Sequence, residues 1–129
     1  MIAFSVETRR RKEMIDITAE VRKAAAGLDN GAVVVFVPHT TAGVTINENA
    51  DPDVRRDLLA HMETLVPEDT PFAHGEGNSD AHVQATLTGS SVTVIMEKGR
   101  LMLGTWQSVF FCEFDGPRTR KVFVQTLAA

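Results

Sequence analysis

The alternation of apolar and polar residues predicts strands near the start of the chain. Ile2–Val6 alternates apolar with small residues, which is typical of a strand. Ala32–Val37 is apolar at every position, which places it in the middle of a sheet or sandwich, and Pro38 ends it. Val44–Glu48 alternates again, as a strand with one polar face does.

Helical spacing appears in three segments. The first helix is expected to begin at Asp16 as N-cap and to end at Gly27. The second begins at Asp51-Pro52, which combines an acidic N-cap with proline at the first helical position. Its apolar stripe is expected to be Val54, Leu58, Met62 and Leu65. The third is capped by Ser79 or Asp80 and stops at Gly89.

The last third of the chain returns to strand patterns. Strands are predicted at Ser91–Met96, Thr105–Phe114 and Lys121–Leu127, and Arg100–Leu103 fits either a strand or a turn. This order of elements indicates an α+β fold with a mostly antiparallel sheet. No linker or repeat divides the sequence, so residues 1–129 are expected to form one domain.

Composition narrows the functional classes. A net charge of −4 argues against a nucleic-acid partner, and the basic run Arg9–Lys12 is interpreted as a solvated strand end or turn. No apolar stretch approaches the roughly 20 residues of a membrane span. The only cysteine, Cys112, lies in an apolar run and is interpreted as a small buried side chain. Without a signal-peptide pattern, we expect a cytoplasmic protein.

Two dense polar segments carry three of the four histidines. His39 follows the apolar strand, whereas His74 and His82 flank a loop rich in glycine and acids. Three histidines with an open position could form a catalytic metal site. The alternative is that each histidine separately bonds to backbone groups. His61, within the second helix, is expected to be partly exposed and structural.

Carboxylates and cations surround these histidines in sequence. The candidate catalytic acids are Glu48, Asp51, Glu76 and Glu113, although Asp51 fits a helix cap equally well. The turn at Gly116–Lys121 presents Arg118 and Arg120, whose guanidinium groups suit phosphate, but such a turn can also be merely solubilising. Trp106 could stack on a heterocycle or pack in the core.

Several motifs in a fixed order carry a family resemblance. They are Asp16-Ile17-Thr18, His39-Thr40-Thr41-Ala42, Asn47-Glu48-Asn49-Ala50-Asp51, His74 through His82, Gly104-Thr105-Trp106-Gln107 and Glu113 through Arg120. With these motifs the chain resembles the YjbQ family, the secondary thiamine-phosphate synthase enzymes, over essentially its whole length. No motif histidine or arginine is replaced.

The resemblance implies a sandwich-like α+β fold, a homotrimer with polar pockets near the subunit interfaces, and weak thiamine-phosphate synthase activity. That reaction joins hydroxymethylpyrimidine diphosphate to thiazole phosphate and releases pyrophosphate. On this view His39, Glu48, Asp51, Glu76 and Glu113 are catalytic candidates. Thr40, Thr41, Asn78, Trp106, Arg118 and Arg120 are candidates for binding the phosphorylated substrate. His39, His74 and His82 are candidates for binding zinc or magnesium. A non-catalytic metal- or anion-binding trimer and a metal-assisted hydrolase remain the alternatives.

The apolar pattern is consistent with the homotrimer that the resemblance implies. Val33–Val37 and Val109–Phe111 are apolar on both faces, and about three helices are available to cover them. A stable homotrimer would supply the remaining cover.

Overall fold

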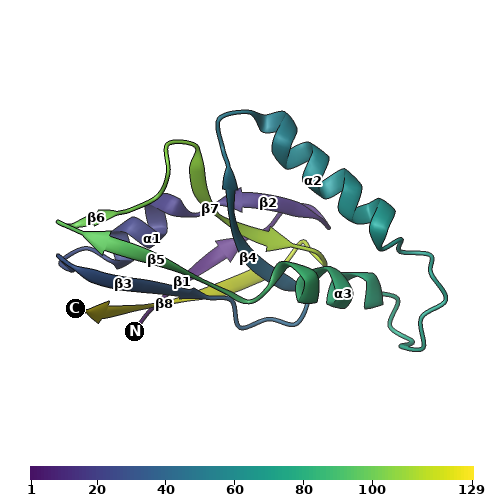
Figure 1. The fold of residues 1–129 in the computed structure, drawn as a ribbon. Coiled ribbons are helices and arrows are strands. Elements are labelled where there is room, and N and C mark those ends of the chain that lie inside the picture. The colour runs from purple at the N-terminus through teal and green to yellow at the C-terminus, as the bar shows by residue number, and fades with distance from the viewer.

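The computed structural model describes residues 1–129, which form eight strands and three helices (Figure 1). The strands are β1 Ile2–Glu7, β2 Glu13–Asp16, β3 Gly31–Phe36, β4 Ala42–Glu48, β5 Ser91–Glu97, β6 Arg100–Leu101, β7 Gln107–Glu113 and β8 Thr119–Ala128. The helices are α1 Thr18–Ala24, α2 Pro52–Leu65 and α3 Ser79–Thr88. The predicted α+β class with three helices is therefore confirmed.

The strands form two antiparallel sheets. The larger sheet has the order β1-β8-β3-β5-β6, and the smaller has the order β2-β7-β4. The last strand, β8, lies between β1 and β3, with Ile2 opposite Val124 and Val35 opposite the same residue on the other side. The two termini therefore lie at the same end of the larger sheet (Figure 1).

The main core lies between the two sheets and is closed by α1. Val33 and Val35 of β3, Val109 and Phe111 of β7 and Val21 of α1 are all fully shielded from solvent. Successive side chains along β7 point to opposite faces of the smaller sheet. One face is apolar because it lies in the main core, and the other is apolar because it lies in a second core.

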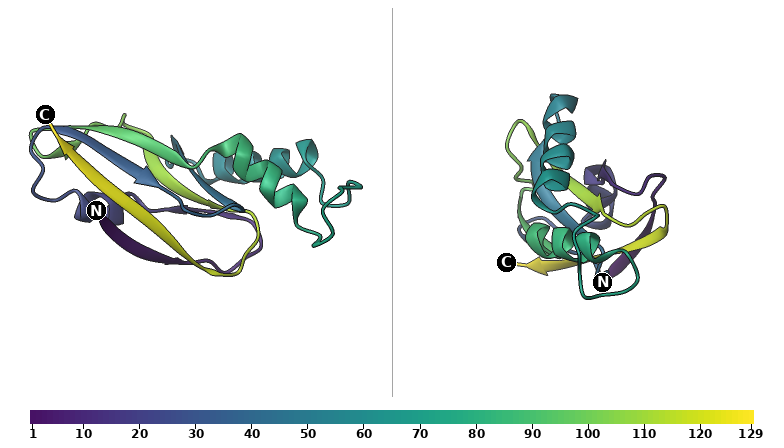
Figure 2. Two further views of the ribbon diagram at one scale, coloured as in Figure 1. Left: turned by 90° about the horizontal axis from the view of Figure 1, so that it is seen from below. Right: turned by 90° about the vertical axis from the view of Figure 1, so that its right-hand side faces the viewer.

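A second, smaller core covers that opposite face within the same chain. Phe110, Cys112 and Phe114 pack there against Ala81 and Ala85 of α3. The predicted need for a partner to cover Val109–Phe111 was therefore wrong, because α2 and α3 cover β7. No helix covers the outer face of the larger sheet, where Phe36 of β3 is 42% exposed (Figure 2).

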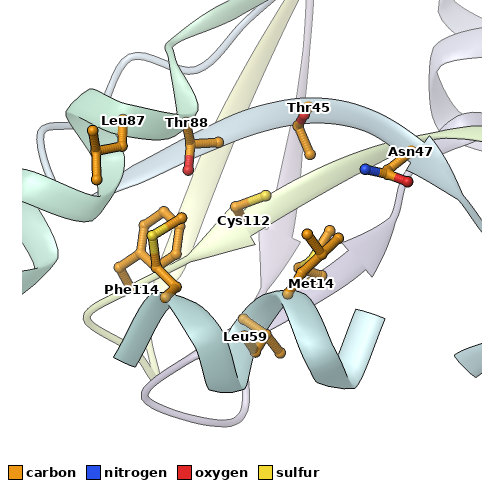
Figure 3. A pocket seen from close by; sticks show the side chains of 10 residues that line it. Met14, Thr45, Asn47, Leu59, Leu87, Thr88, Cys112 and Phe114 are labelled. Atoms are coloured by element: carbon orange, nitrogen blue, oxygen red, sulfur yellow. The ribbon is translucent and has the colours of Figure 1, made fainter. Parts of the chain in front are cut away.

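A hollow of about 180 Å³ remains beside the second core, between α2, α3 and the smaller sheet. Figure 3 shows Met14, Leu59, Cys112 and Phe114 facing it. Burial raises the pKa of the Cys112 thiol to about 12, so the side chain is a protonated, apolar filler. The interpretation of Cys112 as a small buried side chain is confirmed.

The first helix begins differently from the prediction. The basic run leads into β2, which pairs with β7 and which the pattern did not predict. Asp16 ends that strand, and its Oδ1 accepts bonds from the backbone N–H and the hydroxyl of Thr18. Asp16 therefore supports the start of α1 from one position before its N-cap, Ile17.

The second helix has an N-cap as predicted but a different contact face. Asp51 Oδ1 accepts from the backbone N–H of Asp53 at 2.9 Å. No residue of α2 is buried, and Leu58 and Leu65 of the predicted stripe are 39% and 62% exposed. The side that packs on the second core is formed by Met62, which belongs to the predicted stripe, and by Leu59, which does not.

A buried carboxylate ties α3 to the segment before β2. Asp80 is fully buried, accepts two bonds from the guanidinium of Arg11 and is also paired with Lys12. Burial alone would raise the pKa of Asp80, but these bonds and charges lower it from 3.8 to about 2. The N-cap of α3 is Asn78, so neither Ser79 nor Asp80 caps this helix as predicted. Arg11 and Lys12 are bonded to Asp80 and are not a free basic patch.

None of the three helices has the length and apolar character needed to cross a membrane.

Candidate functional site

One open pocket collects most of the candidate residues at one end of the sandwich. It encloses about 410 Å³ and is lined only by polar residues and Pro38. Its lining, which we call the polar pocket, consists of Pro38, His39, Thr40, Thr41, His74, Glu76, Asn78, His82, Asp115, Arg118 and Arg120. Three segments distant in sequence meet here: the β3–β4 connection, the loop before α3 with the start of that helix, and the β7–β8 turn with the start of β8 (Figure 1).

A second hollow of about 450 Å³ adjoins the polar pocket. The two hollows share His39, Thr40 and His82. The second hollow is less polar, because Ala42, Ala85 and Gly89 contribute to its wall. We call it the adjoining hollow.

His39 is held at the boundary between the two hollows. Its Nε2 accepts the backbone N–H of Lys121 at 2.9 Å, so Nδ1 carries the ring proton when the side chain is neutral. Burial, and then the charge of Arg120, lower the pKa of His39 below its ordinary value of 6.5, with Glu113 acting the other way. His39 is therefore neutral at pH 7.

Arg120 is the most strongly fixed cation in the polar pocket. It is 5% exposed, and its Nε and Nη2 bond to the fully buried carboxylate of Glu113. Nη2 also donates to the hydroxyl of Thr41 at 2.9 Å. Nη1 has no partner within the chain, and so a buried guanidinium retains one free N–H₂ group in a pocket that it lines.

Arg118 stands at the exposed rim. Its Nε donates to the backbone oxygen of Asp115 at 2.8 Å, and its Nη2 lies 3.1 Å from the Asp115 carboxylate. Asp115 also accepts from Nδ2 of Asn78 at 3.0 Å, while Oδ1 of Asn78 is shielded and has no partner. Arg118 therefore places a cationic donor at the rim of the pocket.

The two remaining histidines do not complete a metal site in this conformation. The rings of His74 and His82 lie edge to face with centroids 5.5 Å apart, and His74 also approaches Glu76. No group of three or more histidine, cysteine, aspartate or glutamate side chains is arranged closely enough to hold a metal ion. Zinc or magnesium binding by His39, His74 and His82 stays a prediction, and no chemical step is derived through it.

Three of the candidate site residues lie away from the polar pocket: Glu48, Asp51 and Trp106. Ala42 pairs with Glu113 beside the polar pocket, whereas Glu48 pairs with Gln107 six residues further along β4, about 20 Å away. Asp51 caps α2 beyond that end. Trp106 is bonded through its backbone to Asn49 in the same region and is 61% exposed, so the alternative of a packed core aromatic was wrong.

Glu113 lies at the pocket but does not face it. Its side chain is fully buried and bonded to Thr8 and Arg120, which leaves it no path to a ligand. Sequence reasoning missed Thr8, because a single threonine between two charged residues gives no pattern that marks it. Its contacts bridge more than 100 residues and exist only in the folded chain.

His61 is exposed on α2, as predicted.

Together, the fold and site define a small α+β protein with two antiparallel sheets and a polar ligand pocket at one end of the sandwich. The chain belongs to the YjbQ family: the model described as "UPF0047 protein YjbQ-like" matches residues 2–129. The family resemblance inferred from the motifs is confirmed.

Individual relatives agree over nearly full length. The chain is 50% identical to the UPF0047 protein YugU of Bacillus subtilis, over 96% of each chain. It is 45% identical to the UPF0047 protein MJ1081 of Methanocaldococcus jannaschii, over 98% of this chain and 94% of that one. A crystal structure of a YjbQ/UPF0047 family protein from Clostridium acetobutylicum superposes with a TM-score of 0.96 at 53% identity, covering 98% and 100% of the two chains.

Proposed function

We propose that this protein is a transferase that joins two phosphorylated heterocycles, in the manner of a thiamine-phosphate synthase. The observation that carries the proposal is the pair of hollows that share His39, Thr40 and His82. Each hollow falls in the size range of small-molecule sites. Two reactants seated in adjoining hollows would meet at the shared wall, which is the arrangement that a two-substrate transfer requires.

The reaction needs charge stabilisation more than proton transfer. The thiazole nitrogen forms a bond to the pyrimidine methylene carbon while the bond from that carbon to the diphosphate oxygen breaks. The departing pyrophosphate keeps the electron pair, so negative charge grows on it. The free Nη1 of Arg120 is suited to receive that charge, together with the N–H groups of Arg118 that its bonds to Asp115 leave unused.

Two other groups of the polar pocket suit the cationic carbon. Neutral His39 adds no positive charge next to the methylene carbon, which becomes cationic as pyrophosphate leaves. The exposed carboxylate of Glu76, in the same pocket, would favour that cation.

The direct test is synthesis of thiamine phosphate from hydroxymethylpyrimidine diphosphate and thiazole phosphate by purified protein. Release of pyrophosphate in step with product formation would support the proposal. Product no faster than in a protein-free control would contradict it.

Replacing Arg118 by lysine should weaken pyrophosphate binding by about 1–3 kcal/mol. Lysine keeps the charge, but it loses the planar fork and the bond from Nε to the backbone of Asp115 that fixes the side chain. Titration calorimetry on both proteins measures the difference. Arg56→Lys, in an exposed pair on α2, serves as the matched control and should bind as the wild type does. If Arg118→Lys binds pyrophosphate as tightly as the wild type does, the turn is only a solvated loop.

A second candidate is a non-catalytic anion-binding protein. It is favoured by the placement of the proposed catalytic acids, because Glu113 is buried in an ion pair, Asp51 caps a helix and Glu48 lies at the other end of β4. Stoichiometric pyrophosphate binding without thiamine phosphate formation would select this candidate.

We further propose that the protein is a cytoplasmic homotrimer. A closed ring uses two different patches on each subunit, and two of the chain's exposed apolar surfaces are candidates for them. One is the outer face of the larger sheet, with Phe36 and Ile95 exposed by 42% and 66%. The other is the outward stripe of α2, with Leu58 and Leu65. Covering both surfaces would account for their apolar character.

Light scattering should therefore give a mass near three times 14.1 kDa, about 42 kDa, at micromolar concentration. Ile95→Glu and Leu58→Glu, one in each patch, should each give the monomer mass, because both place a charge in an apolar contact. Ala19→Glu, exposed on α1, is the control and should leave the mass unchanged. A monomer mass for the wild type would contradict the trimer.

A further inference from the structure

We propose that Thr8 is a positioning residue that holds both arginines of the polar pocket in place. The inference rests on the proposed role of Arg118 and Arg120 in binding phosphate. Thr8 directly follows β1 and is 6% exposed. Its neighbours in space are Glu113 and Arg118, from 105 and 110 residues away in sequence.

The hydroxyl of Thr8 acts on Arg120 through Glu113. Thr8 Oγ1 donates to Oε1 of Glu113 at 2.8 Å, and Nε of Arg120 donates to that same oxygen at 2.8 Å. A carboxylate fixed at one oxygen by a hydroxyl cannot rotate away from the guanidinium that it pairs with. This arrangement keeps Nε and Nη2 of Arg120 engaged and leaves Nη1 as the group available to a ligand.

The same hydroxyl acts on Arg118 through the backbone. Thr8 Oγ1 accepts the N–H of Arg118 at 2.8 Å, and the backbone N–H of Thr8 donates to the carbonyl oxygen of Arg118 at 2.9 Å. Both backbone groups of Arg118 are therefore satisfied by one residue. The side chain that projects from this fixed backbone is the one at the rim of the pocket.

The β7–β8 turn fits closely against the segment that carries Thr8. The backbone N–H of Gly116 donates to the carbonyl oxygen of Arg11 at 2.8 Å. A Cβ at Gly116 would lie 2.2 Å from the carbonyl oxygen of Arg10 and 2.9 Å from Oγ1 of Thr8. Glycine is therefore required here by close approach, and the turn has no room to move relative to Thr8.

These contacts make Thr8 the shared support of two cations whose other side-chain partners differ, Asp115 for Arg118 and Thr41 for Arg120. Two donors fixed before a ligand arrives bind it with less loss of conformational freedom than two mobile ones. Removing the Thr8 hydroxyl should release both arginines at once.

The experiment compares three substitutions. Thr8→Val keeps the side-chain shape and removes the hydroxyl, whereas Thr8→Ser keeps the hydroxyl. Thr18→Val is the matched control, because Thr18 is also buried and its hydroxyl also bridges a carboxylate, on Asp16, and a backbone N–H, on Val109. Val109 lies four residues along β7 from Glu113, outside the polar pocket.

Pyrophosphate binding by titration calorimetry is the first measurement. Thr8→Val should bind about tenfold more weakly or worse, and Thr8→Ser should stay within about threefold of the wild type. Thr18→Val should bind as the wild type does, even though it unfolds at a lower temperature. Unchanged binding by Thr8→Val, or an equal loss in Thr18→Val, would overturn the inference.

The second measurement does not depend on a ligand. Nuclear magnetic resonance of the arginine Nε–H groups should show a shifted or broadened Arg120 signal in Thr8→Val and a wild-type signal in Thr8→Ser. If the wild type binds no pyrophosphate, the proposed function fails, and the Arg120 signal alone decides the role of Thr8. An Arg120 signal unaffected by Thr8→Val would overturn that role. If Thr8→Val does not fold, Thr8→Cys, whose thiol is a weak donor, takes its place in both measurements.

Discussion

Replacing Glu113 by glutamine should lower the free energy of unfolding by about 3–5 kcal/mol. The substitution keeps the size of the side chain but leaves the guanidinium of Arg120, which is 5% exposed, without a counter-charge. The bond from Thr8 to Oε1 is also disturbed. Such a loss is a large part of the total stability of a small domain. Urea unfolding followed by circular dichroism measures it.

Two further variants show whether charge is the cause. Glu97→Gln, at an exposed position on β5, should change the stability by less than about 0.5 kcal/mol. Glu113→Leu combined with Arg120→Met removes both charges and should recover much of the stability, because a well-packed apolar pair can replace a buried ion pair. The double variant should nevertheless fail to bind pyrophosphate. A Glu113→Gln protein as stable as the wild type would contradict the prediction.

Replacing Asp80 by asparagine should lower the free energy of unfolding at pH 7 by about 2–4 kcal/mol. The carboxylate is fully buried and lies between the guanidinium of Arg11 and the ammonium of Lys12. Asparagine would leave these two cations with only their more exposed partners, Glu63 beside Lys12 and Glu68 beside Arg11. The segment before β2 would then separate from α3 more easily.

The pH dependence identifies the charge of Asp80 as the source of that stability. Its folded-state pKa, about 2, is below the ordinary value of 3.8, so the contribution is present above pH 4 and is lost as the pH falls from 3.8 towards 2. The difference between the wild type and Asp80→Asn should shrink over the same range. Urea unfolding at pH 7, 4 and 2 tests this, with Asp53→Asn, from an exposed pair, as a control that changes little at any pH. A difference that stays constant down to pH 2 would exclude the carboxylate charge as the cause.

Local patterns predicted a helix or strand well where the residues of that element alone determine its structure. Ala32–Val37, Val44–Glu48 and the Asp51-Pro52 helix start all lie where the alternation and the cap placed them. The short strand β2 was missed because its four residues, Glu13–Asp16, show too little alternation and follow a charged run. Its structure depends on pairing with β7, almost 100 residues later.

The candidate site could be predicted only in part, because its residues come from different elements that meet in the folded chain. Polar segments at strand ends located the polar pocket, because such residues meet where strands end. The sequence could not separate Arg120, which is buried beside Glu113, from Arg118, which is exposed at the rim, because both stand in one turn motif. Nor could it show that Glu48 and Trp106 lie at the opposite end of the smaller sheet, since strand direction fixes that distance.

The position of β8 between β1 and β3 has a consequence for synthesis. The first strand emerges from the ribosome early, but its hydrogen-bonding partner is the last strand to be made. Until β8 emerges, β1 and β3 each present an unpaired edge, and the core between the sheets lacks Val122 and Val124. The larger sheet therefore cannot close until β8 has emerged, and nascent chains that stall before Thr119 should be substrates for chaperones.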